Sequence, residues 1–536
     1  MSGNPSNRIS DKIEYKVMGP SIAVLVTICF LIFAYPEASG GVIRALNTWA
    51  TTHLGWLYLI FAAGCLGFLL YVAFNKKYGD IRFGGKDARP DFSTYSWIGM
   101  LITAGLGSSI MYWGSIEWAS YVVGPPFGVE PGSVESYIWA SSFGLFHWGP
   151  SAWAIYCIPT LPIAYAYWNR RRPILKLSTA CEGVIGQKRA EGFWGKLIDI
   201  FFVVGIIGGC GTSIGLGTPM ISTGLNILFG VPKEFTTDLM IIIVWVVVFG
   251  GACYIGVEKG IKRLSDFNFN SALIFLGIIF ILGPSSFIIN NLTEGIGTML
   301  QNYFKMSLTT DVLSEGGFPQ GWTIFYWAWW LVVAPTMGLW VARISRGRTV
   351  REVVLAEIII CSAGCWLMYG VLGNYGMYLD LKGIAPISQI AAESSNYEAI
   401  ATMMLHLPFG KVFLFFFCVI MFLFLATTID AIAMTLAMAT SKNLTVSEDP
   451  PPLYRVFWVA ALVVLPLALM FSGGALKLLQ ASSQITSPPL MVIFVIMTVS
   501  FVKWVRQDKP VAGADYGETE PPALKAEVDS AVSEAK

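Results

Sequence analysis

The sequence predicts an all-α integral membrane protein with about twelve transmembrane helices. Of its 536 residues, 55% are hydrophobic and 13% are charged, and the mean hydropathy is +0.62. A soluble domain carries about 25% charged residues, so this composition is typical of a chain in lipid. Two further observations support the prediction, namely the recurrence of apolar segments of spanning length and the alternating charge of the loops between them.

The apolar segments follow one another along almost the whole chain. They lie near residues 18–34, 55–74, 97–121, 138–168, 197–229, 238–256, 270–290, 322–343, 353–373, 411–440, 454–471 and 481–505. The first segment resembles a signal peptide, but the many later segments favour an uncleaved helix. Residues 294–308 have amphipathic spacing and are expected to lie at the membrane interface. Residues 385–409 are too broken to span and are expected to form one or two surface helices.

Every second loop is basic. Lysines and arginines follow the second, fourth, sixth and eighth segments, whereas the loops between are poor in them and often acidic. The basic positions are Lys76, Lys77, Arg82, Lys86, Arg89, Arg170, Arg171, Arg172, Lys176, Lys188, Arg189, Lys259, Lys262, Arg263, Arg343, Arg346, Arg348 and Arg351. By the positive-inside rule this pattern places both termini in the cytoplasm. The acidic tail after residue 507 is expected to be disordered.

Composition argues against several other classes of protein. The net charge of +1 gives no reason to expect a nucleic-acid partner. Nine cysteines are scattered singly and only three histidines occur, so neither a metal cluster nor an organic cofactor is expected. A membrane-embedded enzyme would need a nucleophile–base pair or a metal cluster, and the predicted spans contain neither. A ligand-gated channel remains a third alternative, and it would conduct far faster than a carrier.

Two predicted spans contain helix-weakening residues near their middle. The third segment has Gly105 and Gly107 followed by two serines, and the eighth has Pro335 and Gly338 within APTMG. Secondary transporters use broken helices to present backbone dipoles to ions and substrate. Glycines in membrane helices also simply allow close packing. Both interpretations stay open for these two spans.

Aromatic residues cluster in the fourth and eighth segments. Trp148, Trp153 and Tyr156 fall within an arc of roughly 140° on an ideal helix. Trp322, Tyr326 and Trp329 share one helix face, and many of the other tryptophans fit interfacial belts. Facing aromatic rings hold a quaternary ammonium by cation–π attraction of roughly 0.5–2 kcal/mol per ring. The clusters therefore predict a site for such a cation.

Four polar groups lie inside predicted spans. Thr427 and Thr428 either bond back to their own helix or provide oxygen ligands for a small cation. Glu117 and Asp430 are ionisable groups inside spans and are functional candidates for that reason. Either acid could instead be buried in a protonated or paired state.

Several motifs resemble the betaine/choline/carnitine transporter family. They are YWGSIEW, FHWGPSAWAIY and WTIFYWAWW followed by ARISRGRTVRE, and the similarity covers nearly all of residues 15–505. YWGSIE, GGFPQGWTIFYWAWW and FHWGP are nearest to carnitine transporters. The resemblance implies two five-helix inverted repeats (a LeuT-like core), alternating access, a homotrimer in the bacterial inner membrane, and transport rather than catalysis. The implied regions are 1–17 (cytoplasmic), 18–96 (two extra helices), 97–292 (first repeat), 293–321 (interfacial helix and outer loop), 322–506 (second repeat) and 507–536 (tail).

The resemblance also assigns substrate-binding residues. The family's aromatic box matches Trp148, Trp153, Tyr156, Trp329 and Trp330. Trp322 matches a second, outer site of carnitine exchangers. Two positions depart from the pattern, because Val333 replaces a tyrosine or tryptophan and Ser120 replaces a tyrosine. Both changes remove ring surface, so the cavity is expected to accept a different or bulkier substrate.

Sodium-coupled members hold Na⁺ between an unwound third segment and the tenth segment. The matching positions are Thr103, Leu106 and Phe424 through carbonyls and Thr427 and Thr428 through hydroxyls. Sodium-independent exchangers replace the ion with an arginine, where this chain has neutral Asn268. Met337 resembles the exchangers' methionine and is the opposing signal. The resemblance thus implies Na⁺ symport of a zwitterionic quaternary ammonium or sulfonium compound, with sodium-independent exchange as the alternative.

Overall fold

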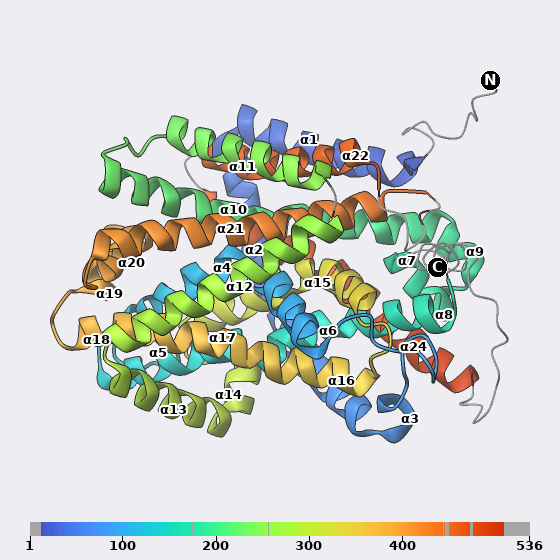
Figure 1. The fold of residues 1–536 in the computed structure, drawn as a ribbon, viewed down its shortest axis with the longest axis horizontal. Coiled ribbons are helices and arrows are strands. Elements are labelled where there is room, and N and C mark those ends of the chain that lie inside the picture. The colour runs from blue at the N-terminus through green and yellow to red at the C-terminus, as the bar shows by residue number, and fades with distance from the viewer. Residues whose placement is uncertain are drawn as a thin grey trace, which may run out of the picture.

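The computed structural model describes residues 12–172, 176–255, 257–442, 444, 450–471 and 475–508. Long helices run side by side and form a single bundle (Figure 1). Its longest helices are α1 (Tyr15–Ala34), α2 (Pro36–Phe74), α4 (Thr94–Val123), α10 (Phe193–Phe229), α11 (Phe235–Ile255), α12 (Val257–Leu282), α15 (Ile324–Ile344), α21 (Gly410–Ala439), α22 (Pro452–Phe471) and α24 (Pro488–Gln507). The predicted fourth segment forms α5 (Val134–His147), α6 (Pro150–Ala164) and the π-helical turn η3 (Tyr165–Asn169).

Shorter helices complete the bundle. The predicted ninth segment is a continuous run of α16 (Val350–Leu355), η5 (Ala356–Cys361), α17 (Ser362–Met368), η6 (Tyr369–Gly373) and α18 (Asn374–Leu381). The remaining elements are α3 (Lys76–Gly79), α7 (Leu177–Ala180), α8 (Glu182–Ile185), α9 (Gln187–Glu191), α13 (Ser285–Gln301), α14 (Tyr303–Leu308), η4 (Pro319–Thr323), α19 (Ile387–Glu393), α20 (Asn396–Leu405) and α23 (Ala475–Thr486). The predicted surface segment 385–409 is thus two helices, α19 and α20.

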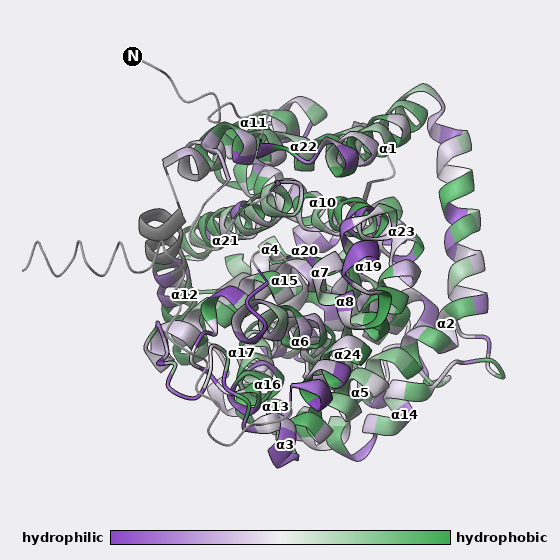
Figure 2. Ribbon diagram, turned by 90° about the vertical axis from the view of Figure 1, so that its right-hand side faces the viewer, coloured by the Kyte–Doolittle hydropathy of each residue, from purple (hydrophilic) through white to green (hydrophobic). Residues whose placement is uncertain are grey.

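Each of the twelve predicted segments falls on helix. Within the described part of the chain, eight helices are long and apolar enough to cross a membrane, or nine if the bent pair α12–α13 counts as one span. The outer helices expose large apolar side chains, among them Phe30 and Phe33 on α1 and Val247 on α11. Figure 2 shows hydrophobic residues along α1, α11 and α22, whereas the short helices α3 and α19 are hydrophilic. Apolar side chains on the outer surface of a helical bundle are stable in contact with lipid. The protein is therefore a multi-pass membrane protein.

The third and fourth predicted segments are broken, but the eighth is not. In α4, Gly107 has φ 51° and ψ −173°, which interrupts the helix inside its span. In the fourth segment, Gly149 with ψ −153° separates α5 from α6, and Pro150 begins the new helix. Of the two interpretations left open for APTMG, the interruption is not found, because α15 continues through Pro335 and Gly338.

Close packing explains the glycine in α15. A Cβ atom at Gly338 would lie 2.9 Å from Cγ of Pro159 on α6, so only glycine permits this approach of the two helices. The packing interpretation of APTMG therefore holds. The second helix break lies instead at Gly149, next to Trp148.

The predicted interfacial helix begins earlier than residue 294. The chain bends by 111° between α12 and α13, and α13 starts at Ser285 just after Pro284. Proline lacks the N–H that would continue α12, so the bend coincides with the residue least able to extend a helix. The amphipathic segment is thus α13 and α14 together.

The described basic loops lie at one end of the bundle. The elements α3, α7, α8, α9 and the start of α16 gather at the right-hand end in Figure 1, opposite α19 and α20. Arginines after α15 join this end to the loop after α2, since Arg351 Nη1 lies 2.8 Å from Asp80 and Arg348 Nη2 donates to the Phe92 carbonyl at 2.9 Å. These arginines therefore form a structural cap, as expected, at the end of α15 away from Trp322.

Candidate functional site

The break in α4 faces α10 and α21. At Gly107 a Cβ atom would lie 2.8 Å from Oγ1 of Thr428, so the unwound backbone is in direct contact with α21. Two residues further along, the Ser109 hydroxyl donates to Ser213 of α10 at 3.1 Å. The positive φ at Gly107 changes the direction of the backbone at this point, as broken helices do in secondary transporters.

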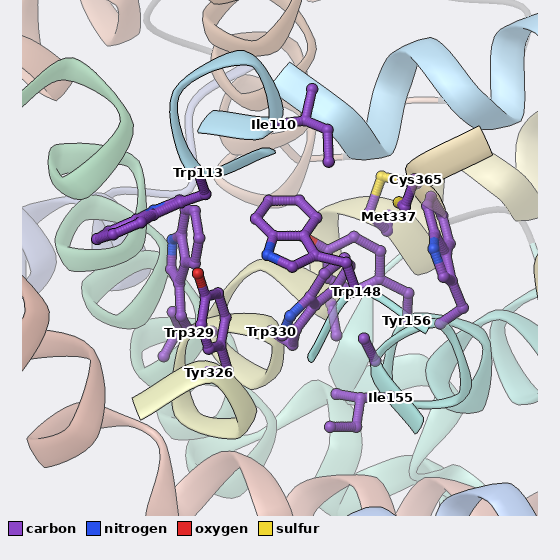
Figure 3. Packing of buried hydrophobic residues seen from close by; sticks show 14 of the residues in the cluster. Ile110, Trp113, Trp148, Ile155, Tyr156, Tyr326, Trp329, Trp330, Met337 and Cys365 are labelled. Carbon is purple, nitrogen blue, oxygen red and sulfur yellow. The ribbon is translucent and has the colours of Figure 1, made fainter. Parts of the chain in front are cut away.

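Five rings from α6, from α15 and from the junction of α5 and α6 meet beside this break. Trp330 of α15 lies 5.2 Å from Trp148, 5.7 Å from Trp153 and 4.3 Å from Tyr156, measured between ring centroids. Trp329 lies 5.9 Å from Trp148, and its indole N–H donates to the Gly209 carbonyl of α10 at 3.1 Å. Figure 3 shows Trp148 and Trp330 at the centre, with Trp329 and Tyr326 on one side and Tyr156 on the other. The structure thus brings together all five residues of the predicted aromatic box.

The box encloses a cavity of about 30 Å³. Its walls are Gly105, Gly107, Ser109, Trp148, Tyr156, Gly209, Cys210, Ser213, Trp329, Trp330, Val333, Thr428 and Ile432. This volume holds only a few water molecules and is far below the roughly 300–1,000 Å³ of pockets that bind drug-sized ligands. A group as large as trimethylammonium does not fit this cavity unless the rings move apart. Val333 lines the wall without a ring, as the sequence indicates.

The sequence reasoning missed the part of the wall that α10 contributes. Gly209, Cys210 and Ser213 lie in a run of small residues, GIIGGCGTSIGLG, whose only sequence signal is its glycine content. A Cβ atom at Gly209 would lie 2.6 Å from Val332 Cγ2 and 3.3 Å from Val333 Cγ2. Small residues are therefore needed there for α10 to approach α15.

Trp322 lies outside the box in a second aromatic cluster. Its ring centroid is 4.8 Å from Tyr121 and 5.6 Å from Trp113, both in edge-on geometry. Tyr121 also packs 5.2 Å from Phe318. A tyrosine ring is thus present beside Trp322 at Tyr121, the residue after Ser120.

Glu117 joins the box to this outer cluster. It is fully buried in α4, and its two carboxylate oxygens accept hydrogen bonds from the hydroxyls of Tyr121, Tyr326 and Tyr369. The Trp148 indole N–H donates to the same carboxylate at 3.3 Å. Of the two acids singled out from the sequence, Glu117 is therefore part of the site. Asp430 is buried on α21 but does not line the cavity.

The expected sodium ligands on α21 lie together. The hydroxyls of Thr427 and Thr428 both donate to the Phe424 carbonyl, at 2.9 Å and 3.1 Å. These bonds agree with helix back-bonding, and they also gather three oxygen atoms beside the α4 break at Gly107. Thr103 and Leu106, the predicted ligands on α4, lie within the four residues before that break.

Residues near this oxygen cluster bear on which ion it can hold. The Asn268 amide of α12 donates to the Leu423 carbonyl at 2.9 Å, so a neutral group packs beside Phe424. On the other side, Met337 Cε lies 3.4 Å from the Cβ position of Gly105, against the broken helix. The Thr103 hydroxyl donates to the Gly99 carbonyl at 2.9 Å, which leaves its own carbonyl as the expected ligand.

Comparisons with known proteins identify the family of the chain. The family described as BCCT, betaine/carnitine/choline family transporter, matches residues 16–510. An uncharacterized transporter, YeaV, of Escherichia coli is 35% identical over 443 residues, 83% of this chain and 91% of that protein. A carnitine transporter of Acinetobacter baumannii is 35% identical over 474 residues, 88% of this chain and 86% of that protein.

A solved structure of a Na⁺-coupled sialic acid symporter in a substrate-bound outward-open state covers 84% of this chain and 86% of its own, with a TM-score of 0.42 and 14% identity. That likeness is too weak to carry a functional argument. The family match and the two relatives span most of the chain, and the aromatic residues that carry the resemblance meet in one place. The chain therefore belongs to the betaine/carnitine/choline transporter family.

Proposed function

We propose that the protein imports a zwitterionic quaternary ammonium compound, or its sulfonium analogue, by Na⁺ symport with alternating access. The observation that carries the proposal is the convergence of Trp148, Trp153, Tyr156 and Trp330 beside the break at Gly107. In the proposed cycle Na⁺ orders the break in α4, the aromatic box binds the onium group, and the core then opens inward.

The chemistry of the cavity supports an onium group rather than a primary amine. Its wall consists of aromatic, aliphatic and small residues with hydroxyls, and it contains no carboxylate. A primary amine needs hydrogen-bond acceptors, whereas a trimethylammonium group is held by ring faces at roughly 0.5–2 kcal/mol per ring. The relative named as a carnitine transporter supports the same substrate class.

The oxygen cluster on α21 supports sodium as the coupling ion. Phe424, Thr427 and Thr428 offer one carbonyl and two hydroxyls, which are the hard oxygen ligands that small cations prefer. Asn268, which packs next to them, brings no fixed positive charge that would replace the ion.

Uptake into proteoliposomes tests the coupling. Radiolabelled betaine and carnitine should accumulate with an inward Na⁺ gradient and not with an equal K⁺ gradient. Thr427→Ala combined with Thr428→Ala should lower Na⁺-driven uptake at least about tenfold, which corresponds to one lost ion ligand at about 1.4 kcal/mol. Thr435→Ala is the matched control, because its hydroxyl bonds back to the Ala431 carbonyl on the same helix at 2.8 Å. Unchanged uptake by the double variant in full sodium would refute the ion site.

Sodium-independent exchange is the second candidate, and Met337 favours it. Its terminal methyl lies against Gly105 of the broken helix, and by resemblance it matches the methionine that exchangers have in place of a second sodium. Exchange predicts that vesicles loaded with unlabelled carnitine take up labelled carnitine without sodium. Symport predicts that such loading has no effect unless sodium is present.

The remaining expectations concern the membrane topology, the internal repeats and the assembly of the transporter. The basic loops gathered at one end of the bundle support a cytoplasmic location for that end and for both termini, in the bacterial inner membrane. Two inverted repeats over 97–292 and 322–506, and assembly as a homotrimer, are proposed from family membership. Most of the acidic tail, from residue 509, lies outside the described residues, as do residues 1–11.

A further inference from the structure

One buried carboxylate accepts hydrogen bonds from donors on four separate segments. The donors to Glu117 are the hydroxyls of Tyr121 on α4, Tyr326 on α15 and Tyr369 at the start of η6, and the indole N–H of Trp148 between α5 and α6. An ionised carboxylate is acceptor-only and offers about four lone-pair sites, so four donors satisfy it fully. A protonated carboxyl would lose one of these sites to its own hydrogen.

Two of these donors connect Glu117 to the binding site, because Trp148 lines the cavity and Tyr326 lies on the helix that carries Trp329 and Trp330. His147 extends the network, since its Nδ1 lies 2.9 Å from the Tyr121 hydroxyl and its Nε2 lies 3.0 Å from Thr323 Oγ1. Glu117 thus fixes the relative positions of the helices that carry the rings, although it does not itself line the cavity.

The bond to Trp148 also has an electronic effect on the ring. An indole that donates its N–H to an anion gains electron density, and the face of an electron-rich ring attracts a cation more strongly. Trp330 offers a comparison within the same box, because its buried indole N–H has no hydrogen-bond partner in the described structure. The two tryptophans therefore differ in their hydrogen bonding although both face the same cavity.

We propose that Glu117 is a positioning residue for cation recognition, which orients Trp148 and strengthens the attraction of its ring for an onium group. This inference rests on the proposed function. The ring faces of the cavity wall attract a positive charge, and the inference adds a second contribution from a buried carboxylate outside the cavity.

The test compares betaine with its carbon isostere, 3,3-dimethylbutanoate, which has the same shape and carboxylate but no positive charge. Tryptophan fluorescence of the full-length protein in saturating Na⁺ reports binding of each compound. Glu117→Gln should weaken betaine binding about tenfold, the size of one charge-assisted hydrogen bond at about 1.4 kcal/mol. It should leave isostere binding within about twofold, because apolar contact with the rings is retained. Glu37→Gln, at an exposed site on α2, should change neither.

A second pair of variants does not depend on the folding of Glu117→Gln. Trp148→Phe keeps an aromatic face but has no N–H for Glu117, whereas Trp330→Phe removes an N–H that makes no such bond. Trp148→Phe should therefore reduce the preference for betaine over the isostere several-fold more than Trp330→Phe does.

The outcomes separate the two proposals. Equal loss of preference in the two phenylalanine variants, or equal weakening of both compounds by Glu117→Gln, would show that Glu117 has only a structural role. If the unmodified protein binds no onium compound, the proposed function fails instead, whatever Glu117 does.

Discussion

Replacement of Gly107 by alanine should destabilise the break in α4 and weaken Na⁺ coupling. The backbone at Gly107 has φ 51° and ψ −173°, in a region that only glycine enters easily, and a side chain there costs about 1–3 kcal/mol. The new Cβ would also lie 2.8 Å from Thr428 Oγ1, closer than Cβ contacts in real proteins, so the hydroxyl expected to bind Na⁺ must shift. The two effects together predict a lower melting temperature and a higher Na⁺ concentration for half-maximal uptake.

The assay measures thermal unfolding in detergent and Na⁺-dependent uptake in proteoliposomes. Gly99→Ala is the matched control, because Gly99 lies on the same helix and a Cβ there meets nothing within 4 Å. Alanine at Gly99 should be neutral or stabilising by up to about 1 kcal/mol through helix propensity. Adding Thr428→Ala to Gly107→Ala should recover part of the stability, since the clash is removed, without recovering Na⁺ dependence. If Gly107→Ala matched Gly99→Ala in both measurements, the reasoning about the break would be refuted.

Two further variants test the cavity wall and an exposed ion pair. Val333→Trp adds a ring to the wall beside Gly209 and removes space from the cavity, so it should favour betaine over the bulkier carnitine by about tenfold, the discrimination that a pocket exerts through size. Competition uptake measures the ratio, and an unchanged ratio contradicts the prediction. The pKa of Glu398 on α20 is lowered from 4.5 by the Ser394 hydroxyl and the Lys233 ammonium, whose Nζ lies 2.9 Å away. Because the pKa of Glu398 is lower in the folded than in the unfolded protein, the ion pair contributes its full stabilisation above pH 4.5. That stabilisation is lost as the pH falls through the pKa of the folded state. Because the pair is exposed, Glu398→Gln should cost at most about 1 kcal/mol at pH 7 and progressively less as the pH falls below 4.5, as melting curves over this pH range would reveal.

Much of the architecture follows from local sequence because lipid leaves few choices. Each backbone N–H or C=O group that is unpaired in the bilayer costs several kcal/mol. Long apolar segments such as 197–229 must therefore be helical. The aromatic residues of the box were also predicted, since Trp148, Trp153, Tyr156, Trp329 and Trp330 lie in two short motifs. Helix ends were harder to predict, and the bend between α12 and α13 at Pro284 moved the interfacial helix by about nine residues relative to the prediction.

Tertiary contacts decided which glycines break a helix. Gly107 and Gly338 look alike in sequence, but Gly338 is held in α15 by close contact with Pro159, whereas Gly107 adopts a positive φ against Thr428. Helix propensity is a local quantity of about 1 kcal/mol per glycine, which packing between helices easily overrides. Local sequence therefore did not distinguish Gly149, where the second break occurs, from APTMG, where the helix continues.

The sequence by itself determined the membrane class, the helical character, the family and the ring-bearing residues, because these depend on hydropathy and on short motifs. Only the tertiary structure placed Tyr121 beside Trp322 and gathered three tyrosines and Trp148 around Glu117. These residues are up to 252 positions apart in the chain, and nothing local to any of them specifies the others. A buried carboxylate is stable only where distant donors converge on it, and that convergence is a property of packed helices rather than of any one segment.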